Sequence, residues 1–319
     1  DTAQWDAGGR RIAMRNLRWS VFAEHVGFSV WTLFAVLVLF MPEEVYGLDA
    51  PDKFLVSAVV TLTGAVLRVP YTLATAVFGG RNWTLFSAIV LLIPATAMLW
   101  IMANPGQPLW MYLAAGAIAG MGGANFASSM TNINAFFPQR EKGWALGLNA
   151  GGGNLGVATI QVVGLIVIAL AGNRSPHWVI GLYLVLLAVA GVGAALRMDN
   201  LPHQPVDVQS MKDVARDRDG WVLSLLYIGT FGSFIGFSFA FGQMLTMTFL
   251  ANGQSPGEAA LHAAQLTFLG PLLGSLTRMG GGRLSDRVGG SRVTFWTFCA
   301  MAVTTLALVY SSTLQAGGD

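Results

Sequence analysis

Nine long apolar stretches constrain the fold of this chain more than any other feature. A helix that crosses a membrane needs about 20 mostly apolar residues, and each stretch reaches that length. The whole chain is only 11% charged, whereas a soluble domain is about 25% charged. The sequence therefore predicts an all-α polytopic membrane protein embedded in a lipid bilayer. The expected spans are residues 19–41, 54–78, 84–103, 108–133, 144–171, 177–196, 221–249, 260–280 and 293–312.

Charge and rare residues exclude several other classes of protein. The formal net charge is only +2 over 319 residues, which gives no basic face for nucleic acid. The single cysteine, Cys299, can form neither an intrachain disulfide nor a thiolate metal site within the chain. The four histidines are scattered, and no sequence pattern of a hydrolase, a metalloprotease or a phosphate loop occurs. We therefore expect no enzyme activity, no metal and no cofactor.

The positions of lysine and arginine predict the orientation of the spans. If the N-terminus lies in the cytoplasm, 14 of the 18 Lys and Arg residues fall on the cytoplasmic side, as the positive-inside rule requires. The first outer loop is acidic instead, with Glu43, Glu44, Asp49 and Asp52. We expect a multi-pass protein of the inner (cytoplasmic) membrane with a cytoplasmic N-terminus.

The chain contains an internal repeat with an offset of 210 residues. When residues 67–86 are set over residues 277–296, Arg68 falls on Arg278. Both segments close the second span of a group, so the repeat unit is six helices in parallel orientation. On this interpretation the chain is a fragment with nine of an expected twelve helices. The expected domains are a six-helix N-terminal bundle at 1–196, a cytoplasmic linker at 197–220, and the first three helices of a C-terminal bundle at 221–319.

Arg68 and Arg278 are the first candidates for a site. A charged side chain at mid-bilayer costs about 2.5–3.5 kcal/mol or more, so it usually has a functional partner. Two arginines at equivalent positions of two bundles would face each other across a central cavity, and Glu24 is the only carboxylate clearly inside a span. Two guanidinium groups without matching acids would trap a planar oxyanion, because each fork donates two parallel hydrogen bonds. The alternative is that each arginine snorkels or bonds backbone carbonyls.

Glycines, amides and aromatic residues accompany the arginines. The fifth span carries glycines at every fourth position, which lets another helix approach closely. Asn149 and Asn154 lie among these glycines and could donate hydrogen bonds to an anion or to a neighbouring helix. Tyr227 and Phe231 lie one turn apart in the seventh span, and Phe126 lies in the fourth. Aromatic residues at helical spacing serve packing at least as often as binding.

Two further groups of residues could carry a proton or form contacts between helices. Glu24 and His25 are an ionisable pair in the first span that could carry a proton. They could equally anchor the helix at the membrane surface, since both lie near its cytoplasmic start. In the loop at 281–292, Asp286 can accept hydrogen bonds from a helix N-terminus or pair with a neighbouring arginine, and such a contact could gate a cavity. The expected gating residues are Gly282, Asp286, Arg287 and Arg292.

Five stretches of the chain carry motifs that are specific enough to compare with a known family. They are LRVPY…FGGRNWT (67–84), GMGGANFASSMTNINAFFP (120–138), GWALGLNAGGGNLGVATIQ (143–161), YIGTFGSFIGFS (227–238) and GGGRLSDRVGG (280–290). These motifs resemble the nitrate/nitrite porters of the major facilitator superfamily, the NarK-type proteins. The resemblance covers essentially the whole chain. It implies a major-facilitator fold of twelve helices in two bundles and a nitrate or nitrite substrate.

The resemblance also implies a binding site and a mechanism. An anion would neutralise the repulsion between the two arginines and draw the bundles together in a monomeric alternating-access carrier. Proton-coupled nitrate symport is slightly favoured over nitrate/nitrite antiport, because residues 15–31 look like the subgroup linked with proton symport. A non-transporting nitrate sensor and a carrier of another small anion stay open as alternatives. The residues that match the family's anion-binding positions are Arg68, Arg278, Asn154, Tyr227, Phe126 and Phe231.

Overall fold

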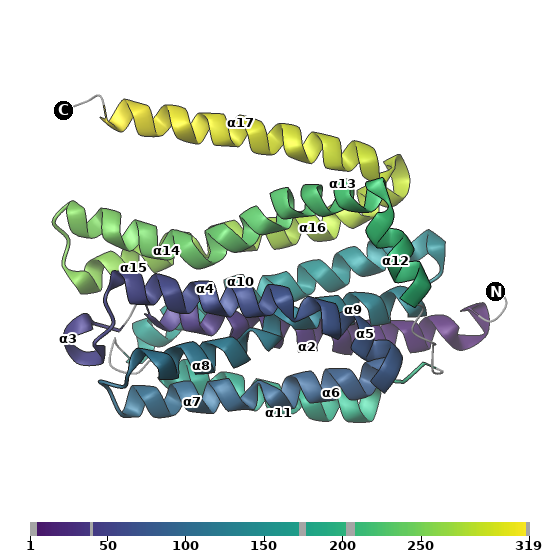
Figure 1. Cartoon of the computed structure of the whole chain (residues 1–319), viewed down its shortest axis with the longest axis horizontal. Coiled ribbons are helices and arrows are strands. Elements are labelled where there is room, and N and C mark those ends of the chain that lie inside the picture. The colour runs from purple at the N-terminus through teal and green to yellow at the C-terminus, as the bar shows by residue number, and fades with distance from the viewer. Residues whose placement is uncertain (1–4, 39–40, 172–176, 202–207, 317–319) are drawn as a thin grey trace.

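The structure, a computed structural model, describes residues 5–38, 41–171, 177–201 and 208–316. Within these residues every regular element is a helix, and the long helices run alongside one another (Figure 1). The short elements are η1 (Trp5–Gly9), α3 (Glu43–Tyr46), η3 (Gln139–Glu141) and η4 (Ile228–Gly232). The longer ones are α2 (Arg10–Leu37), α4 (Ala50–Val66), α5 (Arg68–Phe78), α6 (Gly80–Val90), α7 (Leu92–Ala103), α8 (Leu109–Ala119), α9 (Met121–Phe136), α10 (Lys142–Ala171), α11 (His177–Arg197), α12 (Val208–Arg216), α13 (Arg218–Tyr227), α14 (Ser233–Ala251), α15 (Pro256–Thr267), α16 (Leu269–Val288) and α17 (Gly290–Ala316).

These helices confirm the predicted all-α membrane fold, with one difference in the spans. In the described ranges, seven helices are long and apolar enough to cross a membrane, or eight if the bent pair α4–α5 counts as one span. They match eight of the nine predicted stretches. The remaining stretch, 108–133, lies in α8 and α9 and is not among them. α9 carries several polar side chains, which lower its hydropathy. Those that it buries against its neighbours are Asn125, Ser128, Ser129 and Asn132.

Prolines break three of the membrane passes at a fixed distance. A proline has no N–H for the carbonyl four residues earlier, so a helix bends or ends there. α4, α6 and α15 each end four residues before a proline. In each case the next helix starts two residues after that end, so the proline lies in its first turn. The bend between α4 and α5 is 42°. The last residues of the three helices and their prolines are Val66 and Pro70, Val90 and Pro94, and Thr267 and Pro271.

The glycines of α10 face two different helices. A Cβ on Gly147 would lie 3.0 Å from the Cα of Gly282 in α16, so these two backbones touch. A Cβ on Gly156 would instead collide with the carbonyl of His25 in α2. The glycine pattern that the sequence shows as one repeat therefore serves two interfaces. α10 thus packs against α2 on one face and against α16 on the other.

α2 is the central helix of the molecule. Every residue from Val26 to Val38 is buried, and Trp31 donates a hydrogen bond from its indole Nε1 to the carbonyl of Val60 at 2.9 Å. The hydrophobic core forms around this half of α2. A helix that is packed on all sides can hold a polar side chain away from both membrane surfaces, and Glu24 is such a side chain on α2.

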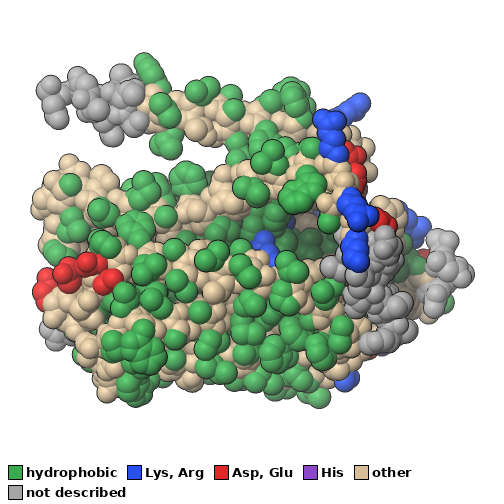
Figure 2. Space-filling model, viewed as in Figure 1, with side chains coloured by type: hydrophobic (Ala, Val, Ile, Leu, Met, Phe, Trp, Pro, Cys, Tyr) green, Lys and Arg blue, Asp and Glu red, His purple; other side chains and the backbone are tan. Residues whose placement is uncertain are grey.

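Charge separates the two ends of the molecule. Figure 2 shows Lys and Arg side chains gathered at one end, a group of Asp and Glu side chains at the other, and mostly hydrophobic side chains between them. We call the first the basic end; α2, α6 and α10 begin there, and α5, α11 and α16 end there. The opposite end carries α3 with its acidic residues.

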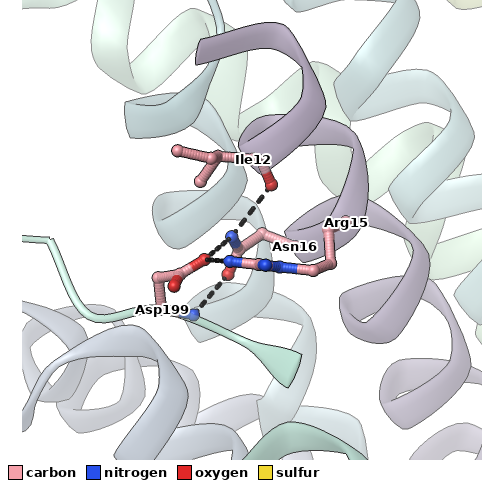
Figure 3. A network of polar contacts seen from close by, with 4 residues as sticks. All are labelled: Ile12, Arg15, Asn16 and Asp199. Atoms are coloured by element: carbon pink, nitrogen blue, oxygen red, sulfur yellow. Dashed lines mark hydrogen bonds and ion pairs between the residues drawn. The ribbon is translucent and has the colours of Figure 1, made fainter. Parts of the chain in front are cut away.

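A polar network joins helix ends at the basic end (Figure 3). The carboxylate of Asp199, which follows α11, accepts hydrogen bonds from Nη2 of Arg15 at 2.6 Å and Nδ2 of Asn16 at 2.7 Å. The backbone N–H of Asp199 donates to Oδ1 of Asn16 at 2.9 Å. Partial burial of the carboxylate opposes its ionisation, but the bonds from Arg15 and Asn16 outweigh that effect, so the pKa of Asp199 lies below its ordinary value.

Candidate anion site

The structure brings Arg68 and Arg278 to the same pair of aromatic rings. The Cζ of Arg68 lies 5.0 Å from the ring centre of Phe126 and 4.6 Å from that of Phe231. The Cζ of Arg278 lies 5.1 Å and 5.5 Å from the same two centres. Such contacts between a guanidinium and a ring face are attractive. The two cations, 210 positions apart in the sequence, therefore converge on one place.

The aromatic residues form a stack beside the arginines. The rings of Phe126 and Phe231 are 5.5 Å apart and inclined by 27°. Tyr227 stacks on Phe231 at 5.1 Å and 10°. Arg68 donates a long hydrogen bond of 3.4 Å from Nη1 to the hydroxyl of Tyr227. Both phenylalanines are buried, whereas Tyr227 is 37% exposed.

A π-helical turn places Tyr227 and Phe231. η4 (Ile228–Gly232) interrupts the pass formed by α13 and α14, and it follows Tyr227 directly. Single π turns inside α-helices occur often at functional sites. The wider turn brings these two rings, four residues apart, into near-parallel contact. The sequence analysis missed this turn; the glycines Gly229 and Gly232 around Phe231 were the available signal.

An open cavity of about 690 Å³ adjoins Arg278. Arg278, Asn154, Tyr227 and Phe231 line it. Asn154 is 1% exposed, and its side-chain oxygen has no hydrogen-bond partner. Buried amides without a partner are rare and call for an explanation such as a ligand or water. Within the described part of the chain, neither Arg68 nor Arg278 has an ion-pair partner.

Glu24 lies deeper in its helix than the sequence predicts. The apolar pattern places it near the cytoplasmic start of the first helix, but α2 begins at Arg10 and runs for 28 residues. Glu24 is therefore about 21 Å along the helix and fully buried. The hydropathy of the sequence marks only where apolar residues begin, whereas the helix itself continues through the charged residues before them.

The buried carboxylate of Glu24 is held by residues from two other helices. Its Oε2 accepts hydrogen bonds from the hydroxyl of Ser129 in α9 and from Nδ2 of Asn149 in α10, the latter at 2.9 Å. Its Oε1 has no partner. The carboxylate is close enough to Arg278 and Arg68 to interact with both electrostatically. Glu24 is therefore a buried acid within electrostatic range of both arginines, although it forms no ion pair with either of them in the described residues.

His25 does not share this position. Its Nδ1 lies 3.0 Å from the carbonyl oxygen of Gly152 in α10. The ring thus contacts the glycine face of α10 that packs on α2. Of the predicted pair, only Glu24 lies in the electrostatic range of the arginines. Across the described ranges, no group of three or more His, Cys, Asp or Glu residues could hold a metal ion.

Comparison with known proteins identifies the family. The model of the Major Facilitator Superfamily matches residues 25–318. The chain belongs to that superfamily. The nitrate/nitrite transporter NarU of Salmonella typhimurium is 37% identical, over 96% of this chain and 68% of the relative. NarU of Escherichia coli is also 37% identical, over 94% of this chain and 66% of the relative.

More distant relatives belong to the same branch. A probable nitrate/nitrite antiporter of Thermus thermophilus is 32% identical, over 92% of this chain and 69% of the relative. The chain thus spans about two thirds of the length of these relatives. The predicted resemblance to NarK-type proteins is confirmed, and the chain is a multi-pass membrane protein of this major facilitator family.

Asp286 makes a contact between two helices at the basic end of this major facilitator. Its Oδ2 accepts a hydrogen bond of 2.8 Å from the backbone N–H of Trp144, in the first turn of α10. This is one of the two contacts that the sequence analysis considered for Asp286; the other, an ion pair with a neighbouring arginine, does not occur in the described residues. A carboxylate at a helix N-terminus is favourable electrostatically.

The other predicted gating residues differ in their contacts. Gly282 lies one turn before Asp286, against Gly147. Arg287 and Arg292 make no ion pair within the same ranges.

The opposite end of this major facilitator holds contacts that the sequence analysis missed. Gln243 in α14 donates from Nε2 to the hydroxyl of Ser57 at 2.9 Å and to the carbonyl of Lys53 at 3.3 Å, both in α4. Nearby, the rings of Trp31 and Phe239 lie 4.9 Å apart. These residues are far apart in sequence and have no spacing signal. They join the first passes to the seventh on the side away from Asp286.

Proposed function

We propose that this protein transports nitrate, nitrite or both across the inner membrane by alternating access, with the anion held between Arg68 and Arg278. The observation that carries the proposal is the convergence of two arginines, neither with an ion-pair partner in the described chain, on one aromatic pair beside an open cavity. The printed names of the relatives, nitrate/nitrite transporters, support this choice of anion.

The side chains divide the work of binding in this proposal. Each guanidinium donates parallel hydrogen bonds to a planar oxyanion, which a lysine cannot do. Phe126 and Phe231 exclude water from the flat faces of the anion, which strengthens the charge interactions. Asn154 and Tyr227 line the cavity with groups that can complete its hydrogen-bond shell. No bond is made or broken in the anion, so the protein acts as a carrier and not as an enzyme.

Movement follows from the same charges. Without an anion, two like charges at one place resist approach of the helices that carry them; with an anion, they attract it from both sides. We propose that the bundles at 1–196 and 221–319 rock about the linker at 197–220. The contacts of Asp286 with Trp144 at one end, and of Gln243 with Ser57 at the other, would break alternately. The N-terminus lies in the cytoplasm, and one monomer contains the site.

Coupling to protons is the favoured mode of transport. Glu24 is buried within electrostatic range of both arginines, so its charge changes the cost of closing the site around an anion. A proton that binds Glu24 would leave two positive charges for one nitrate. Nitrate/nitrite antiport is the second candidate, and the printed name of the Thermus thermophilus relative favours it.

Proteoliposomes containing the purified protein separate these modes. Nitrate uptake is measured into empty vesicles under an inward proton gradient, and into vesicles preloaded with nitrite at equal pH. Gradient-driven uptake into empty vesicles supports symport, and uptake only into preloaded vesicles supports antiport. Binding of nitrate without uptake in either arm would reject transport, and uptake of chloride as fast as nitrate would reject the assigned anion.

A further inference from the structure

A second cavity lies at the basic end, apart from the anion site. It has a volume of about 880 Å³ and lies where η1 and the first turns of α2 meet the end of α11. We call it the arginine pocket. The arginines that line it are Arg10, Arg11, Arg15, Arg18 and Arg197, and Asp6 is the acid in its lining.

Most of the positive charge in the arginine pocket is unneutralised. Only Arg15 forms an ion pair, with Asp199, in the part of the chain that the structure describes. Even there, Nε of Arg15 is buried without a hydrogen-bond partner. The other four arginines are exposed. Like charges around one cavity repel one another, so a bound anion would stabilise the arrangement.

The spacing of the arginines suits a phosphate group. Arg11, Arg15 and Arg18 are four and three residues apart, so they lie on one face of α2. Arg197 approaches from the last turn of α11. Several guanidinium groups that line one cavity suit the oxygens of a phosphate, which arginine binds through paired hydrogen bonds.

An apolar surface beside the pocket indicates that the phosphate belongs to a lipid. α11 exposes Leu196, directly before Arg197, by 75% and Val192 by 59%. Both lie on the side of α11 that faces away from the core. The indole of Trp19 packs on Gly193 next to them, and tryptophan favours the membrane–water interface. A soluble phosphate would use the arginines alone, whereas a phospholipid would use the arginines and this apolar face.

We propose that the arginine pocket binds the phosphate headgroup of an anionic phospholipid, with the acyl chains along the exposed face of α11. Basic pockets between membrane helices on the cytoplasmic side bind such headgroups in general. A lipid in this position would hold the first turns of α2, the helix that carries Glu24. The proposal does not depend on which anion the protein transports.

The test compares two triple variants of the full chain. Arg10→Gln, Arg11→Gln and Arg18→Gln together remove three charges from the pocket and leave the Arg15–Asp199 pair intact. The matched control is Lys212→Gln, Arg216→Gln and Arg218→Gln, which removes three charges from α12 and α13. Retention of dioleoylphosphatidylglycerol and dioleoylphosphatidylcholine is measured for each purified protein by native mass spectrometry.

The unsubstituted protein and the control are expected to retain phosphatidylglycerol in preference to phosphatidylcholine. The pocket variant should lose this preference by about fivefold for each arginine removed. Equal retention of the two lipids by the unsubstituted protein would overturn the proposal, and so would an equal loss in both triple variants, because the effect would then be bulk charge. Displacement of the lipid by millimolar inorganic phosphate would show a site for soluble anions instead.

A second variant covers the case in which the triple pocket variant does not fold. Arg18 is exposed and forms no ion pair within the described ranges, so Arg18→Gln alone should keep the fold. We expect it to lower the preference for phosphatidylglycerol about fivefold. The same preference in Arg18→Gln as in the unsubstituted protein would overturn the assignment.

Discussion

Arg68 and Arg278 bring the same charge to the same two rings, but their helices hold them differently. Arg68 is the first residue of α5, directly after the break at Leu67. Arg278 lies inside the continuous helix α16, seven residues after Pro271. The repeat sets Gly280 where the first half has Pro70. The internal repeat thus preserves the arginine without preserving the backbone that positions it.

The two halves also differ in their acids. The first half supplies Glu24, which α9 and α10 hold by hydrogen bonds from Ser129 and Asn149. In the described residues from Arg218 onward, no carboxylate is buried. Among the described residues, Glu24 is therefore the one buried carboxylate, and this asymmetry is where the proposed coupling to a proton would enter.

Replacing either arginine by lysine should have the largest effect. Arg68→Lys and Arg278→Lys keep the charge but lose the planar fork that binds a nitrate bidentately. We expect each to reduce initial nitrate uptake more than tenfold, or about 1.4 kcal/mol. Because both guanidinium groups lie at similar distances from the rings, the two losses should be similar. Uptake into proteoliposomes measures this.

Arg140→Lys is the matched control, because Arg140 is exposed at the basic end and pairs with its neighbour Glu141. It should leave uptake unchanged. Near-normal uptake in both site variants would show that charge alone suffices. A loss in only one would show that one half-site binds the anion and the other serves packing.

Replacing Glu24, the buried acid, should distinguish proton-coupled symport from nitrate/nitrite antiport. Glu24→Gln keeps a hydrogen-bond acceptor for Ser129 and Asn149 but cannot carry a proton. We expect proton-driven nitrate uptake to fall at least tenfold, while uptake into nitrite-loaded vesicles continues. Glu258→Gln, at an exposed helix cap, should change neither. If Glu24→Gln keeps full gradient-driven uptake, the proton is carried elsewhere or not at all.

The difference in backbone predicts unequal effects of two prolines. Pro70→Ala restores a possible hydrogen bond to Val66 and should straighten the bend that orients Arg68. We expect nitrate binding to weaken roughly threefold to tenfold. Pro271→Ala acts two turns away from Arg278 and should change the Kd by less than about twofold. Equal effects, measured by nitrate titration of the purified variants, would show that the two arginines are held alike.

Sequence reasoning found the arginines because the repeat marks both of them, independently of any structure. It also singled out the aromatic residues and Asn154 by their positions in the spans. Only the resemblance to a family assigned them to anion binding, since aromatic residues at helical spacing fit packing equally well. The span lengths followed from apolar runs. The two faces of α10 could not be separated, because a glycine repeat shows that a helix approaches but not which one.

The missed features depend on tertiary contacts. The depth of Glu24 requires knowing that α2 continues through Arg10 to Arg18, where hydropathy is low. The hydrogen bond of Gln243 to Ser57 joins positions 186 apart in the chain, and nothing in either segment points to the other. The π turn after Tyr227 is a local change in backbone that residue spacing does not encode.

Arg15 gives the smallest effect and completes the comparison, because it is an arginine that does have an acid. Its partner Asp199 has a pKa below the ordinary value, so the ionised carboxylate stabilises the folded state at neutral pH. This stabilisation is lost as the pH falls through that lowered pKa.

Asp199→Asn should lower the stability of the folded state by only about 0.2–1 kcal/mol, since the pair is partly exposed to solvent. Thermal unfolding in detergent should show this difference at pH 7, and the two proteins should converge as the pH is lowered below 3.8, the ordinary pKa of an aspartate. A constant difference at all pH values would mean that Asp199 acts through its backbone bond to Asn16 and not through its charge. Nitrate uptake should be unaffected, because the pair of Arg15 and Asp199 lies at the basic end and lines neither the cavity beside Arg278 nor the aromatic pair.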